Sequence, residues 1–199
     1  MNRIIPFLSA AFLFSAGISN AQAQAPRLQA SGRASTAVCV SNQCQMTDTS
    51  ALTVLIEYGQ THARGREVWG TLVPLDTVWR LGANPATHLI SRVPLTIGGT
   101  RLPAGKYTLH LRPTASAGHL IVSDTTGVWG TPYIGAAKDR ARIPLRSRNL
   151  SENIESLNIV LVPDGTTPNA GVLQIIWGKR EFSVNWTAQV PAGRAGEFR

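Results

Sequence analysis

The sequence predicts an all-β protein, mainly antiparallel, built as a β-sandwich or a partly open barrel with few short helical turns. Hydrophobic residues recur at every second position in several runs, which is the period of a strand with one face on a core. Glycine, proline and asparagine punctuate these runs at short intervals. No helical pattern of convincing length is present. Many short strands joined by such turns are typical of sandwiches and barrels.

The individual strands are predicted from the alternating runs. In each run one row of side chains faces a core and the other row faces water. The clearest alternation covers residues 52–58, 107–112, 156–161 and 181–186, and further strands are predicted at 87–93, 119–123, 141–146 and 172–177.

Turn signals connect these strands. Gly98-Gly99 predicts a tight hairpin, and Gly178-Lys179 predicts that the last two strands pair as a second hairpin. Asp164-Gly165 marks a longer loop. Short helical turns are predicted near residues 74–81 and 134–139.

The N-terminus has the pattern of a secretory signal peptide over residues 1–23. Arg3 supplies the positive start, residues 4–18 are largely apolar, and Ala21-Gln22-Ala23 gives a small-x-small cleavage pattern. Ala23-Gln24-Ala25 offers a second cleavage site. The apolar run is shorter than the roughly 20 residues that a spanning helix needs, which argues against a membrane anchor. The protein is therefore expected to be exported to the periplasm or beyond.

The rest of the chain is long enough for one domain with a substantial core. Residues 24–35 are small and polar, so we expect a disordered N-terminus in the mature protein. Residues 36–187 are predicted to form a single β domain, and residues 188–199 a C-terminal tail.

Cys39 and Cys44 are the only two cysteines. In an oxidising compartment such a pair is most simply a disulfide that closes a short loop. The alternative is half of a metal site, which would need two further ligands from elsewhere. No ligand spacing in the sequence supports that alternative, so no metal site is predicted.

The chain is basic, with 19 Lys and Arg against 11 Asp and Glu, a net charge of +8. Removal of Arg3 with the signal leaves 18 basic and 11 acidic residues, a net charge of +7. One basic cluster is interpreted as a solvated strand face, with weak, salt-dependent binding to anionic surfaces as the alternative. Nucleic acid is not expected as a partner, because no aromatic residues interleave with the cluster. The cluster consists of Lys138, Arg140, Arg142, Arg146 and Arg148.

Known catalytic motifs are missing from the sequence. It contains no nucleophile elbow, no zinc-protease helix and no phosphate-binding glycine loop, and no cofactor is predicted. Glu57 and Asp76 are interpreted first as ion-pair partners of nearby arginines, and second as a general acid or base. His88 is the most interesting histidine, because it follows the turn at Asn84.

A dense block from Arg64 to Tyr107 contains the strongest candidates for ligand binding. Its run Trp79-Arg80-Leu81-Gly82-Ala83-Asn84 combines an aromatic wall with a guanidinium and an amide. The same residues also suit a structural role, in which Trp79 plugs the core and Arg80 bonds to loop carbonyls. The candidate ligand-binding residues are Arg80, Asn84, Trp79, His88, Arg64 and Arg66.

An ordered series of short motifs runs along about residues 51–186. The motifs are Arg64-Gly65-Arg66, Val68-Trp69-Gly70, Leu72-Val73-Pro74, Val78-Trp79-Arg80, Gly82-Ala83-Asn84, Ala86-Thr87, Ile97-Gly98-Gly99, Leu102-Pro103-Ala104-Gly105-Lys106-Tyr107, Trp129-Gly130 and the final Trp177. This series resembles the bacterial family called domain of unknown function 2911. The resemblance implies an exported bacterial protein, but it implies no activity, cofactor or catalytic residue.

Three functions are compatible with these observations. The first is a non-enzymatic binding module for a small polar or envelope-derived ligand, with Arg80 and Asn84 as anchors. The second is a cell-envelope hydrolase that uses Glu57, Asp76 or His88. The third is a structural or interaction protein whose loop block only holds the fold together.

Overall fold

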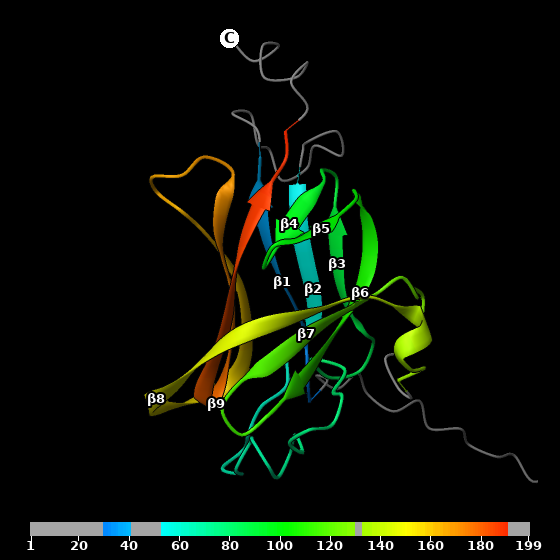
Figure 1. The fold of residues 1–199 in the computed structure, drawn as a ribbon. Helices are drawn as coiled ribbons and strands as arrows, with labels where there is room; N and C mark the ends of the chain where they lie inside the picture. The colour runs from blue at the N-terminus through cyan, green and yellow to red at the C-terminus, as the bar shows by residue number, and fades with distance from the viewer. Residues whose placement is uncertain (1–29, 41–52, 130–132, 191–199) are drawn as a thin grey trace, which may run out of the picture.

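The computed structural model describes residues 30–40, 53–129 and 133–190, and within these ranges the chain forms nine strands and one 3-10 turn (Figure 1). None of this described chain forms a helix long and apolar enough to cross a membrane. The strands are β1 (Arg33–Cys39), β2 (Thr53–Gly59), β3 (Thr87–Ser91), β4 (Leu95–Ile97), β5 (Thr100–Leu102), β6 (Gly105–Pro113), β7 (Gly118–Ser123), β8 (Asp139–Pro163) and β9 (Ala170–Ala188), and the turn η1 covers Ala136–Lys138.

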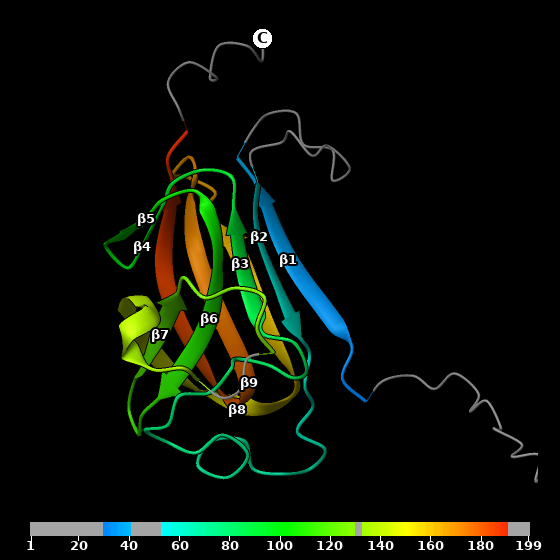
Figure 2. The ribbon, with the colours of Figure 1, turned by 90° about the vertical axis from the view of Figure 1, so that its right-hand side faces the viewer.

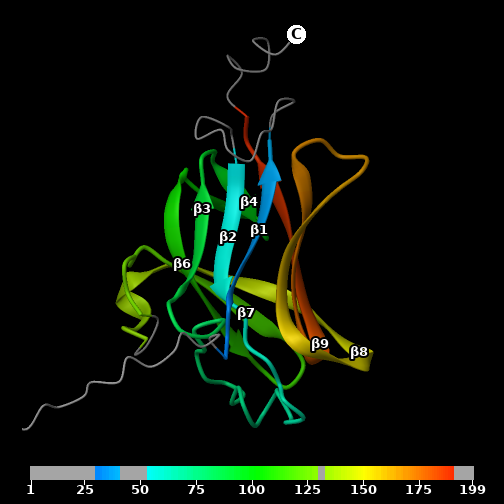
Figure 3. The ribbon, with the colours of Figure 1, turned by 180° about the vertical axis from the view of Figure 1, so that it is seen from behind.

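The strands form one antiparallel sheet in the order β1-β2-β3-β6-β7-β8-β9-β4-β5. Strand β8 links two layers, because its first part pairs with β7 and its part from Arg146 onward pairs with β9. Figure 2 shows β1, β2, β3 and β6 side by side, and Figure 3 shows the long β8–β9 pair beside β1. At this open side the amide of Leu161 donates to Thr36 Oγ1 at 3.2 Å. The sheet folds back on itself without closing, which confirms the predicted all-β, antiparallel class.

The predicted alternation is confirmed on β2 and only in part on the other strands. On β2, Val54, Ile56 and Tyr58 are buried, while Leu55 and Glu57 between them are half-buried on the opposite face. On β3 and β6, Leu89, Tyr107 and Leu109 belong to the core cluster, but Thr108 and His110 in the alternate row of β6 are buried as well. The centre of this layer is therefore covered on both faces, and the outward row predicted to face water is buried there.

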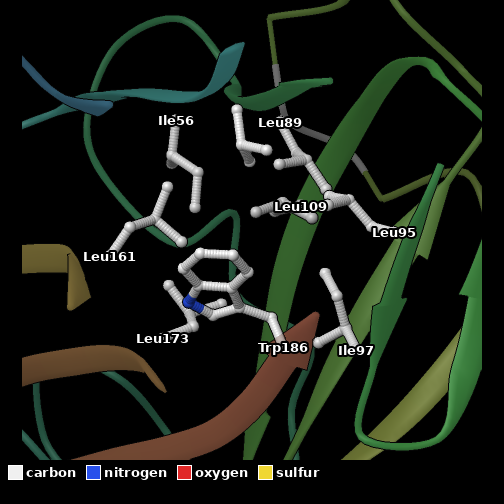
Figure 4. A pocket seen from close by; sticks show the side chains of 9 residues that line it. Ile56, Leu89, Leu95, Ile97, Leu109, Leu161, Leu173 and Trp186 are labelled. Atoms are coloured by element: carbon white, nitrogen blue, oxygen red, sulfur yellow. The ribbon is translucent and has the colours of Figure 1, made fainter. Parts of the chain in front are cut away.

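The interior of the molecule is tightly packed. Nine apolar side chains surround a void of only about 10 Å³, with Trp186 next to the aliphatic side chains in Figure 4. A space of this size holds at most one water molecule, and its apolar lining gives a water little to bond to. The void between the layers is therefore a packing defect and too small for a ligand.

The hairpin at Gly98-Gly99 is confirmed, but the hairpin predicted at Gly178-Lys179 is wrong. β4 and β5 pair around Gly98-Gly99, whose φ angles are 53° and 81°. Gly178 has φ 58°, yet β9 continues through it from Ala170 to Ala188. The pairing with β8 shifts register near this position, so the glycine accommodates an irregularity in a long strand and does not reverse the chain. The runs at 141–146 and 156–161 likewise belong to one strand, β8.

The predicted boundaries and turns agree with the structure in part. β1 begins at Arg33, inside the segment predicted to be disordered, and β9 ends at Ala188. The turn η1 lies in the predicted range 134–139, whereas the described chain has no helical turn near residues 74–81. The predicted signal peptide, Cys44 and most of the tail lie outside the described residues, so cleavage and the Cys39–Cys44 bridge stay predictions.

Candidate functional site

An open hollow lies between the segment that leads into β1 and the loop that precedes β3. Its volume is about 600 Å³. This volume is within the usual range for small-molecule sites, which is roughly 300–1,000 Å³. The lining residues are Ala30, Ser31, Arg33, Asn84, Pro85 and Trp129.

The loop that carries Asn84 is held against the end of β2 by a close backbone approach. The amide of Ala83 donates to the carbonyl of Gly59 at 3.0 Å. A Cβ at Gly59 would lie 1.7 Å from the Ala83 oxygen, so only glycine allows this approach. Asn84 has φ 58°, and its Nδ2 donates to the carbonyl of Ser31 at 3.1 Å. Asn84 thus joins the loop to the segment that leads into β1, and both border the hollow.

Arg33 provides the positive charge of the hollow. It is exposed and lies opposite Gly59, on the face of β1 that points away from the core-facing Val38. Its guanidinium makes no hydrogen bond or ion pair with another described residue. Arginine presents several donors in a planar fork that matches carboxylate and phosphate groups.

Trp129 forms an apolar wall of the hollow. With 60% of its surface exposed, it is the most exposed large hydrophobic side chain in the described ranges. The segment before it is anchored by Thr108 Oγ1, which donates to the carbonyl of Thr125, and Gly127 then turns the chain with φ 74°. Large exposed aromatic rings beside a concave surface commonly mark binding sites.

His88 and Glu57 lie next to this region, directly opposite each other on β3 and β2. Burial lowers the pKa of His88 from its ordinary value, the charges of Lys106 and Arg33 lower it further, and Glu57 opposes the shift. Within the described ranges, the buried Nε2 of His88 has no hydrogen-bond partner. Arg33 and Lys106 thus add positive charge near His88, and Glu57 offsets part of it.

Among the predicted ligand-binding residues, the structure brings Asn84 into the hollow and places two others beside it. Arg64 donates through Nη2 to the carbonyl of Ala30 at 2.8 Å, so it supports the rim. His88 lies four residues after Asn84, at the strand that follows the loop.

The other three predicted residues support the loops. Trp79 stacks on Trp177 with ring centroids 5.5 Å apart, and its edge meets Trp69 at 6.1 Å. Arg66 donates through Nε to the carbonyl of Ala63 at 2.9 Å, and Arg80 donates through Nε to the carbonyl of Gly82 at 3.1 Å. Trp79 thus packs against other aromatic rings and Arg80 bonds to a loop carbonyl, as expected if the Trp79–Asn84 run has a structural role.

Sequence reasoning missed Arg33 and Trp129. Arg33 lies in a small, polar segment that has the composition of a disordered terminus. Trp129 follows Gly127 in a stretch without alternation, where nothing distinguishes an exposed tryptophan from a buried one. The family motif Trp129-Gly130 singled out this tryptophan but implied no role for it, and the small-residue turn around Asn84 was the one predicted binding element that lines the hollow.

The basic cluster on β8 is largely balanced by acids and amides. Arg140 pairs with Asp124 at 2.6 Å, and Arg142 pairs with Asp139 at 2.8 Å. Arg148 pairs with Glu181, and Arg146 donates to Asn185 Oδ1 at 2.7 Å. Lys138 is exposed at the end of η1. These pairs weaken the positive potential that an anionic surface would meet.

A second polar cluster lies under the segment that leads into β8. Tyr133 donates to Asp139 Oδ2 at 2.5 Å, and the Tyr133 ring lies 5.2 Å from the ring of His110. Burial lowers the pKa of His110, and Asp139 opposes that shift.

Asp76, the third acid–base candidate, lies elsewhere and pairs with Arg112 at 3.5 Å. The described chain holds no group of three or more His, Cys, Asp or Glu arranged for a metal ion.

Comparisons with known proteins identify the family and nothing more. Searches of curated proteins and of solved structures gave no significant match. A family model described as "Protein of unknown function (DUF2911)" matches residues 41–186, which include Asn84, Pro85 and Trp129 of the hollow but not Arg33. Because this match spans most of the sequence, the chain belongs to the DUF2911 family.

Proposed function

We propose that this protein is an exported, non-enzymatic binding module that holds a small polar or envelope-derived ligand in the hollow. The observation that carries the proposal is the meeting of an exposed tryptophan ring and an exposed arginine without a described partner at one concave surface. A hollow with an apolar wall and a few convergent polar groups is the usual form of a small-molecule site.

The scaffold around the hollow supports a preformed site. β1 and the loop at Asn84 are tied together by the hydrogen bond from Asn84 to Ser31, and the loop is fixed on β2 through Gly59. A backbone that is already held in place reduces the loop ordering that binding must bring about. The hollow therefore needs no large rearrangement to accept a ligand.

Binding is tested by a thermal-shift screen of the purified protein against sugars, peptidoglycan fragments, amino acids, nucleotides and metal ions. A ligand that binds the folded state raises the melting temperature by mass action. We expect a hit that Trp129→Ala abolishes and Ile134→Ala leaves intact, because Ile134 is similarly exposed but does not line the hollow. A hit that survives Trp129→Ala, or no hit at all, would contradict the proposal.

Export is proposed from the signal pattern at residues 1–23, and the Cys39–Cys44 disulfide is proposed because an exported protein meets an oxidising compartment. N-terminal sequencing of protein recovered from a bacterial periplasm should begin at Gln24 or Pro26, the residues that follow the two cleavage patterns. A product that still begins at Met1 would contradict export by cleavage. For the disulfide, two thiols that react without prior reduction would contradict the bridge.

A hydrolase is the second candidate function, and the position of Glu57 opposite His88 favours it. A carboxylate next to a histidine is a common acid–base pair. Its test is turnover of envelope fragments by Glu57→Gln and His88→Gln, with Glu152→Gln, at an exposed position of β8, as the matched control. Hydrolysis that Glu57→Gln and His88→Gln both leave unchanged would exclude this pair as the acid and base.

A purely structural role is favoured only by the loop-supporting contacts of Trp79, Arg66 and Arg80.

A further inference from the structure

We infer that the hollow selects small ring compounds that carry a carboxylate, with the carboxylate on Arg33 and the ring against Trp129. This inference rests on the proposed binding function and names the chemical class of its ligand. An acidic sugar and an aromatic acid share this chemistry, and the test below separates them.

The charges around the hollow favour an anion. Arg33 lines the hollow without a described partner of its own, and Lys106 is exposed on the same face of the sheet. Arg64 reaches the rim through the carbonyl of Ala30. Glu57 acts on His88 beside the hollow, and Glu155 accepts from the amide of Arg64 at 2.6 Å, so two acids offset part of this positive charge. Arg33, which has no described acidic partner, carries the uncompensated positive charge of the hollow. The planar Arg33 guanidinium offers a carboxylate two parallel donors.

The wall of the hollow favours a ring. Trp129 exposes 60% of its surface, and a flat ring can cover its indole face and remove apolar area from water. Neither Ala30 nor Pro85 on the neighbouring wall offers a side-chain hydrogen bond. A compact anion without a ring would use Arg33 but leave this wall exposed. The two features together therefore select a ligand with both parts.

The remaining polar groups suit hydroxyl or amide substituents on the ring. Ser31 is half-buried at the rim, and Asn84 uses Nδ2 for its bond to the Ser31 carbonyl, which leaves the amide oxygen as an acceptor. Such neutral groups orient a ligand without adding charge.

The two halves of the site have different origins along the chain. Asn84, Pro85 and Trp129 lie within the residues that match the family model, whereas Ala30, Ser31 and Arg33 precede them. Arg33 is therefore the residue that would give this chain its preference for an anion. The ring-binding wall would act without it, with lower affinity and no charge selectivity.

The test is isothermal titration calorimetry with matched acid and neutral pairs, which are glucuronate against glucose and benzoate against benzyl alcohol. The proteins are the unchanged chain, Arg33→Gln, Arg33→Lys and the control Arg101→Gln. Arg101 is exposed on β5, far along the sheet from β1. We expect one acid to bind about tenfold more tightly than its neutral partner, since a charge-assisted bidentate contact exceeds a neutral one.

Arg33→Gln should remove the preference for the acid over its neutral partner. Arg33→Lys should keep part of that preference, because lysine retains the charge but not the planar fork of donors. The control Arg101→Gln should keep all of it. Preference for glucuronate would identify an acidic sugar, and preference for benzoate an aromatic acid. Equal binding of acid and neutral partner, lost in Trp129→Ala, would overturn the inference and leave the binding function standing. No binding of any of the four compounds, combined with a thermal-shift screen without hits, would overturn both.

Discussion

Arg180 is a buried arginine whose hydrogen bonds are supplied by one loop and one strand. Only 6% of its surface is exposed. Its guanidinium donates to the carbonyls of Thr114 and Ala115 at 2.8 and 3.1 Å, and to Ser147 Oγ at 2.9 Å. It also lies over the ring of Phe182, 4.7 Å from the centroid. Burial lowers the pKa of Arg180, but arginine stays charged at any physiological pH.

We predict that Arg180→Ala lowers the free energy of unfolding by about 2 kcal/mol or more, because each stranded buried acceptor costs about 1–3 kcal/mol. Arg180→Lys should also destabilise the protein, since an ammonium cannot reach all three acceptors at once. Lys179→Ala, at the exposed neighbouring position, is the control. Urea unfolding measures all three variants. Equal midpoints for Arg180→Ala and Lys179→Ala would show that this network adds no stability.

The buried histidines make stability depend on pH. Burial lowers the pKa of His88 and of His110 below the ordinary value of 6.5. As the pH falls below 6.5, these two histidines therefore become protonated more readily in the unfolded chain than in the folded chain. The free energy of unfolding consequently falls. Urea midpoints between pH 7.5 and 5.5 should show this loss. The double variant His88→Gln/His110→Gln should flatten the dependence. An unchanged slope in the double variant would contradict the assignment.

At the scale of elements, the loop before β3 takes its position from Gly59 at the end of β2. We predict that Gly59→Ala destabilises the protein by about 1–3 kcal/mol, because the new Cβ would overlap the Ala83 carbonyl at 1.7 Å. The same change should weaken ligand binding, since it displaces Asn84. Gly165→Ala is the matched control, with no atom within 4 Å of the added Cβ. Equal melting temperatures of the two variants would show that the close approach is not required.

Strands were predictable where one face is buried, because a period of two follows directly from the alternation of core and solvent. This is why β2 agrees with the expected run, whereas β6 and β7 were located by their hydrophobic rows although their other face is also largely buried. The continuity of β8 and β9 was not predictable. A glycine at positive φ suits both a hairpin and an irregularity within a strand. Gly178 has a positive φ and lies at an irregularity within β9. What decides between them is the partner strand, which lies far away in the sequence.

At the scale of the whole molecule, the hollow is assembled from three distant segments, around residues 30–33, 84–85 and 129. Periodicity and turn signals are local, so they pointed to Asn84 and could not reveal that Arg33 and Trp129 meet it. The tryptophans illustrate the limit. Trp79 had the more suggestive sequence context, yet it stacks on Trp177 and supports the loops. Trp129, in a plain context, is the ring that faces solvent.

The most direct measurement of where a ligand binds is the NMR spectrum of the indole N–H groups, because the five tryptophans each give one signal. Trp129→Phe and Trp79→Phe assign the two signals that matter. During titration with glucuronate or benzoate, binding in the hollow predicts that the Trp129 signal moves while the signals of Trp69, Trp79 and Trp177 stay in place. Movement of the Trp79 and Trp69 signals with Trp129 unchanged would contradict a site in the hollow and locate binding on the Trp79–Arg80 loop.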